Sequence, residues 1–72
     1  MKPAVERFLK DGKALIEACD EVPEAGQDYA MSVAERLESM MDWAEENDHV
    51  TEKMTNALEG WESGISKWLD RA

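Results

Sequence analysis

The sequence contains very little cysteine, with Cys19 the only one among 72 residues. An intrachain disulfide needs two thiols, so the fold must be held together by noncovalent packing. A lone thiol also lacks the disulfide framework of small secreted domains and fits a reducing compartment. We therefore expect a cytoplasmic protein whose single small core supplies only about 3–5 kcal/mol of stability.

Long apolar runs are missing as well. No stretch approaches the roughly 20 apolar residues that a membrane-spanning helix needs. The opening segment, "MKPAVERFLKDG", carries charges inside any apolar region that a secretory signal would require. We expect a soluble chain that does not enter a membrane.

Basic residues are scarce, with 8 Lys and Arg against 17 Asp and Glu, which gives a net charge of −9. The imbalance is concentrated in residues 24–52, where Arg36 stands against nine acidic residues. Such a field repels nucleic acids and anionic membranes and attracts basic surfaces. The charge therefore argues against direct nucleic-acid binding and predicts a basic surface of another protein as the partner.

Proline and glycine are few and lie where helices are expected to begin or end. Pro3 suits the first turn of a helix, and Pro23 cannot continue that helix but can open the next one. Asn47 or Asp48 can adopt the left-handed conformation that ends a helix, and Thr51 is a good N-cap. These signals predict one domain, residues 1–72, with three helices near residues 3–20, 23–47 and 51–70.

Apolar residues recur at steps of three and four within each predicted helix, which is typical of a helix with one buried face. The three stripes are Val5, Phe8, Leu9, Gly12, Leu15, Ile16 and Cys19; Ala30, Val33, Leu37, Met40, Met41 and Ala44; and Met54, Ala57, Leu58, Trp61, Ile65, Trp68 and Leu69. Short connections favour antiparallel neighbours. The pattern predicts an all-α three-helix bundle, and it leaves open a dimerising helical hairpin with the N-terminal helix packed across it. Gly12 predicts close approach of a neighbouring helix or indole ring.

The sequence contains few residues that could bind a metal ion or take part in catalysis. Glu46 and His49 form a Glu-x-x-His pair of the kind used by ferritin-like iron bundles, but those sites need a second pair. This chain has one histidine. Cys19 lies on an apolar stripe, where an inert thiol is expected. We predict no metal, no cofactor and no enzymatic activity.

The acidic side of the second predicted helix is more informative. When Leu37 and Met40 face inward, five carboxylates fall on the outer side, namely Glu35, Glu38, Asp42, Glu45 and Glu46. A solvated face is one interpretation. The other is a docking strip for a basic protein surface, or a mimic of nucleic acid, with Trp43 and Met41 adding apolar contacts at its edge.

These observations lead to two functional hypotheses. The first is a small, acidic, non-catalytic protein-binding module, such as an inhibitor, that acts through this second helix. The alternative is a homo-oligomeric assembly module that uses the apolar face of the third helix, where Trp61 and Trp68 lie seven residues apart. In that case a homodimer forms and the carboxylates serve solubility alone.

The segment "HVTEKMTNALEGW", residues 49–61, resembles a helix-start pattern of small phage and prophage helical proteins, Thr-Glu-Lys-Gln followed by Ala-Leu. The matching residues are Thr51, Glu52, Lys53, Ala57 and Leu58, whereas Met54 replaces the glutamine. The likeness covers only this short segment and carries over no functional residue. It implies an origin in a mobile element and a mode of action by stoichiometric binding to a host factor.

Overall fold

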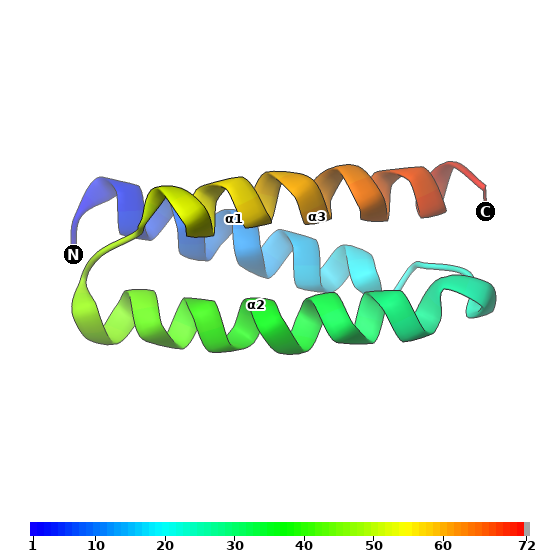
Figure 1. Ribbon diagram of the computed structural model, residues 1–72, viewed down its shortest axis with the longest axis horizontal. Helices are drawn as coiled ribbons and strands as arrows, with labels where there is room; N and C mark the ends of the chain where they lie inside the picture. Colours follow the sequence, from blue (N-terminus) through cyan, green and yellow to red (C-terminus); the bar gives the residue numbers. More distant parts are fainter. Residues whose placement is uncertain (72) are drawn as a thin grey trace.

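The computed structural model describes residues 1–71, which form a rod of three α-helices measuring 36 × 17 × 17 Å. Helix α1 spans Pro3–Cys19, α2 spans Gln27–Asn47 and α3 spans Glu52–Asp70, with a short 3₁₀ turn, η1, at Glu24–Gly26. The helices run up, down and up, so the two chain ends lie at opposite ends of the rod (Figure 1). The predicted all-α three-helix bundle is confirmed, and it closes within one chain.

The core is built from the three apolar stripes predicted above. Its largest fully buried side chains are Leu37, Ile65, Val5 and Val33. Helix α1 packs mainly against α2, and α3 lies along both. The described chain has no buried polar or charged residue, so burial of apolar area supplies the main driving force for folding.

The close approach predicted at Gly12 is confirmed. A methyl group placed on Gly12 would lie 2.8 Å from the sulfur of Met41 and 3.4 Å from a methyl carbon of Leu37. The missing side chain thus lets α2 come near the middle of α1. Met41 fills that space and is only partly exposed.

The second helical segment begins at Glu24, directly after Pro23 as predicted, but its first turn is the 3₁₀ turn η1. Pro23 has an extended ψ of 155° and precedes η1, and α2 begins only at Gln27. Trp68 packs closely over this turn, since a Cβ placed on Gly26 would lie 2.6 Å from its indole. The side-chain amide of Gln27 turns back and donates to the carbonyl oxygen of Val22, which satisfies a backbone group left open where α1 ends.

The corner between α2 and α3 follows the predicted capping chemistry. Asp48 takes the left-handed conformation, with φ 47° and ψ 47°, and ends α2. Thr51 caps α3, because its hydroxyl accepts a hydrogen bond of 3.2 Å from the amide of Met54. Val50 precedes the cap and packs against the core. Within the described residues, no helix is both long and apolar enough to cross a membrane.

Candidate functional site

The five predicted carboxylates all lie on the solvent side of α2. We call the set Glu35, Glu38, Asp42, Glu45 and Glu46 the acidic stripe, and every member is exposed. Leu37 and Ala44 face the opposite way and are fully buried, which fixes the rotation of the helix. None of the side-chain hydrogen bonds within residues 1–71 uses a stripe carboxylate. The five carboxylates of the stripe therefore face solvent without a side-chain hydrogen bond to the described residues.

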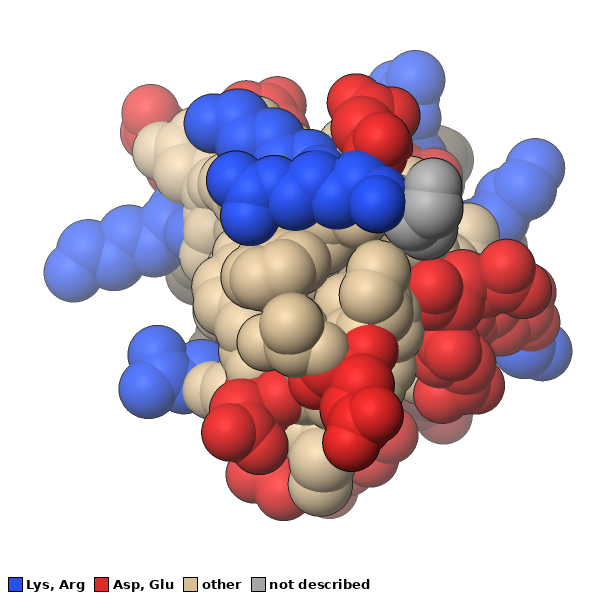
Figure 2. Space-filling model, turned by 90° about the vertical axis from the view of Figure 1, so that its right-hand side faces the viewer, with Lys and Arg blue, Asp and Glu red and all other residues tan. Residues whose placement is uncertain are grey.

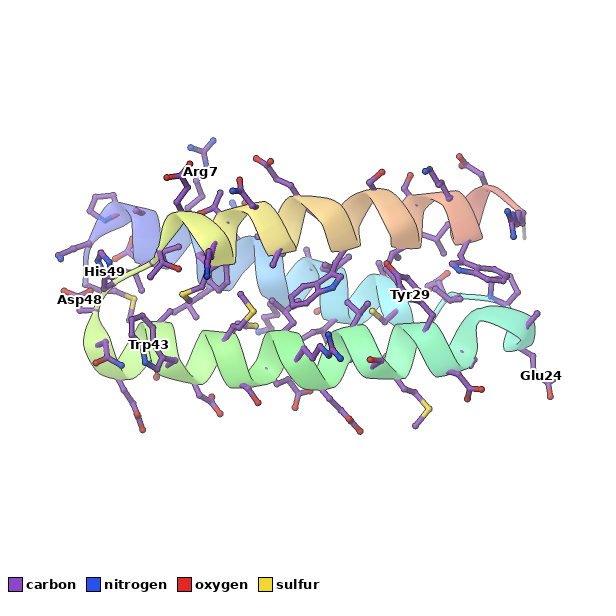
Figure 3. All side chains as sticks on the ribbon, in the orientation of Figure 1. Arg7, Glu24, Tyr29, Trp43, Asp48 and His49 are labelled. Atoms are coloured by element: carbon purple, nitrogen blue, oxygen red, sulfur yellow. The ribbon has the colours of Figure 1, made fainter. Side chains whose placement is uncertain are left out.

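Trp43 provides exposed apolar surface beside the stripe. Its side chain is 43 % exposed, and its ring meets the ring of His49 edge-on at a centroid distance of 6.2 Å. Both residues are labelled at the α2–α3 corner in Figure 3. The side-chain amide of Asn47 donates to the carbonyl oxygen of Trp43 at 2.8 Å. Met41, by contrast, packs over Gly12, so Trp43 is the predicted apolar residue that remains open to a partner.

Charge is unevenly distributed around the rod. Figure 2 shows acidic side chains crowded along the lower side, which α2 forms, and along the right-hand side. Lys and Arg side chains lie mainly on the upper and left-hand sides of the same view. The outer face of α2 is thus one of two sides on which acidic side chains gather in this view.

A shallow groove of about 490 Å³ runs between α2 and α3, on a different side of α2 from the acidic stripe. We call it the α2–α3 groove, and its lining is Arg36, Ser39, Met40, Lys53, Met54, Ala57 and Trp61. The lining contains two cationic side chains and no carboxylate. Figure 3 looks onto this side of the molecule, with Tyr29 between the two helices. The groove is mostly apolar and opens to solvent.

Two carboxylates of different helices lie close together on the α1–α3 side. The pKa of Glu62 is raised, first by partial burial and then by the negative charges of Asp11 and Glu59. Asp11 and Glu62 also line a small pocket there with Leu15 and Ile65. This pair weakens the bundle when both groups are charged.

The predicted inert thiol agrees with the geometry. Cys19 is buried, and its pKa is raised first by burial and then by the charge of Asp20. His49 is exposed at the α2–α3 corner. In the part of the chain that the structure describes, no group of three or more His, Cys, Asp or Glu side chains is arranged to hold a metal ion.

Comparison with known proteins does not assign this chain to a family. No family model, curated protein or solved structure matches it. A function must therefore be argued from the two surfaces of α2, the acidic stripe and the α2–α3 groove.

The groove was not anticipated from the sequence, although a signal for it is present. In the sequence, Arg36 is the single basic residue among nine acids in residues 24–52, whereas the structure places it in one groove lining with Lys53 of α3. One line of residues, spaced three or four apart along α3 and ending at its C-cap, contains only basic and small side chains. Its members are Lys53, Ala57, Gly60, Gly64, Lys67 and Arg71. Its first two members, Lys53 and Ala57, line the groove.

Proposed function

We propose that this chain is a non-catalytic protein-binding module that presents the acidic stripe of α2 to a basic surface of another protein. The observation that carries the proposal is the exposure of all five stripe carboxylates on one side of a helix. A partner with Lys or Arg at matching positions would gain attraction and fast encounter. Trp43 adds apolar contact area where the stripe meets the α2–α3 corner.

The energetics of the free helix support a role for the stripe beyond folding. Like charges at steps of three and four residues destabilise a helix by about 0.2–0.5 kcal/mol per pair. Glu38 and Asp42 form such a pair, as do Asp42 and Glu45. A basic partner would replace this repulsion with attraction. An inhibitor that occupies a basic site on a host protein is the form of this function that we favour.

A pull-down from the native host, with two matched baits, tests the proposal. The first bait carries Gln or Asn at the five stripe positions. The second carries Gln or Asn at five exposed acids elsewhere, so that both lose the same charge: Glu6, Glu17, Glu21, Glu59 and Asp70. We expect a basic protein to be captured by the wild-type and second baits and lost from the first. Equal loss from both variants would show that only net charge matters, and full capture by both would show that the stripe charges are not used; either result would reject the stripe as a site.

Kinetics with the captured partner then test the electrostatic mechanism. Reversing the charge at Glu38 and Asp42 should slow association more than it speeds dissociation, because a peripheral charge acts mainly on encounter. Affinity should also fall steeply with added salt. An affinity independent of salt would remove the proposal.

The second candidate is a homo-oligomeric assembly module built on α3. Met54, Leu58 and Ile65 are already buried within the chain. The remaining apolar surface of α3 is therefore limited to half-buried residues such as Trp61. Light scattering across a dilution series distinguishes the candidates, because a monomer at every concentration rejects the second one.

A further inference from the structure

We propose that the α2–α3 groove is a second docking site and that it takes an amphipathic helix with acidic flanks from another protein. This inference goes beyond the proposed function, which uses a different side of α2. It rests on the shape of the groove, on its small residues and on the sign of its charges.

The shape of the groove fits about two turns of a helix. Its apolar floor is formed by Met40 of α2 and by Met54 and Trp61 of α3. Met54 and Trp61 are seven residues apart, which corresponds to about 10 Å along α3. A helix laid along this seam would bury side chains at positions i, i+3 or i+4, and i+7, which is the usual pattern of helix-in-groove recognition. Methionine side chains adapt readily to such a ligand.

Small residues on α3 allow a helix backbone to come close. Ala57 lines the groove, and Gly60 follows it three residues later on the same side of α3. A Cβ added at Gly60 would meet no atom within 4 Å, so this side of α3 is open. Glycine within a helix costs about 1 kcal/mol relative to alanine, and packing inside this chain does not explain it at Gly60.

The charges of the groove select an acidic ligand. Arg36 on α2 and Lys53 on α3 stand in its lining, where no carboxylate is present. A helix with Glu or Asp on both flanks would pair with these two cations from the two sides. The acidic stripe lies on the adjoining side of α2, where Ser39 of the groove is three residues from Asp42 and four from Glu35. Arg36 and Lys53 are nevertheless the only charged side chains among the groove's lining residues, so a ligand seated in the groove meets them first.

The same charges disfavour the other occupants. A second copy docked symmetrically, groove to groove, would bring two cationic linings together without a carboxylate between them. A nucleic acid strand would carry its phosphates past the groove and into the field of a molecule with net charge −9. An acidic amphipathic helix needs acidic residues only along the two turns, about 10 Å, that lie in the groove beside the two cations.

Titration of the ¹⁵N-labelled full chain with two synthetic 18-residue helical peptides tests the proposal by NMR. Both peptides carry the same Leu and Met stripe, and one has Glu and the other Lys on its flanks. We expect the Glu peptide to shift resonances of groove residues, including the indole N–H of Trp61. The Lys peptide should bind there at least about ten-fold more weakly. Arg36→Glu with Lys53→Glu should reverse this preference.

Two further variants make the test specific. Gly60→Trp should weaken the Glu peptide at least about ten-fold, because the new ring would fill open space beside the groove. Glu38→Lys with Asp42→Lys should not weaken it, because these residues belong to the acidic stripe. Binding of the Glu peptide to the groove would therefore be unchanged if the acidic stripe proved to have no partner. Likewise, failure of the Glu peptide to bind would leave the stripe proposal untouched.

Several results would overturn the proposal. They are an absence of shifts in the groove, equal affinity for the two peptides, and an unchanged preference in the Arg36→Glu, Lys53→Glu variant. A wild-type dimer that this variant dissociates, measured by sedimentation equilibrium, would assign the groove to a second copy instead. Displacement of the Glu peptide by single-stranded oligonucleotide would assign it to nucleic acid.

Discussion

The backbone amide of Lys2 donates a hydrogen bond of 2.9 Å to Oδ1 of Asp48, 46 residues further along the chain. Lys2 is the N-cap of α1 but contributes no side-chain cap of its own. Asp48 therefore supplies an acceptor and a negative charge to the N-terminal end of α1, where the helix dipole favours them. The same residue ends α2 in the left-handed conformation. One side chain thus links the start of α1 to the end of α2.

We predict that Asp48→Ala destabilises the protein by about 1–2 kcal/mol, through loss of the hydrogen bond and through left-handed strain. Asp48→Gly should cost less, because glycine adopts a positive φ without steric penalty. Urea unfolding followed by circular dichroism measures both values. Equal costs for the two variants would show that the backbone conformation contributes nothing.

Two glycines of α3 should respond to alanine in opposite directions. Gly60→Ala should stabilise the protein by about 0.5–1 kcal/mol, because alanine is the better helix former and the space is open. Gly64→Ala should destabilise it, since the new methyl would lie 2.9 Å from Cζ of Tyr29. Thermal unfolding of the two variants gives the signs.

A double-mutant cycle checks the cause at Gly64. In a Tyr29→Ala background the obstructing ring is gone, so Gly64→Ala should no longer destabilise the protein. If the penalty persisted there, the contact with Tyr29 would not be its source.

The raised pKa of Glu62 predicts a pH-dependent stability. Burial and the charges of Asp11 and Glu59 disfavour the ionised form in the folded state, so this carboxylate opposes folding when it is charged. Its penalty is present above the folded-state pKa and disappears as the pH falls through that pKa and then the unfolded-state pKa. Glu62→Gln should therefore stabilise the protein at pH 7, with a gain that shrinks in acid.

Denaturant midpoints of wild-type and Glu62→Gln protein between pH 4 and pH 7 measure this effect. Glu17→Gln removes one exposed carboxylate on the outer part of α1 and serves as the control. A gain that grew in acid would reverse the assigned sign.

Cys19 should react slowly with thiol reagents in the folded state. Burial raises the pKa of its thiol, with a smaller contribution from Asp20, so little thiolate is present at neutral pH and access is restricted. The rate with a disulfide reagent should rise many-fold in denaturing urea. Asp20→Asn should increase the native rate only slightly, because burial is the larger cause. Equal rates in native and unfolded protein would contradict the buried position.

Local signals in the sequence predict most of this fold. The apolar stripes place Leu37 and Ile65 in the core, and the spacing of capping residues marks Asp48 and Thr51 as the helix boundaries. These features depend on residues within a turn or two of each other. Helical periodicity is sufficient to predict them.

Features that depend on distant residues could not be predicted in this way. The packing of Trp68 on Gly26, 42 residues earlier, and the hydrogen bond from Lys2 to Asp48 both join distant parts of the chain. Periodicity likewise placed the stripe acids on the outer face of α2, but it did not show that Arg36 and Lys53 would line the same groove. A stripe indicates which side of a helix is buried, whereas the identity of its neighbour depends on how the helices dock.

The separation of the acidic stripe from the two cations of the α2–α3 groove gives the molecule a permanent electric dipole component across its short axis. A charged surface will therefore exert a torque on the rod as it diffuses nearby, and the rod will rotate before any contact forms. Encounters with a positively charged surface are therefore biased toward those in which the acidic stripe faces that surface.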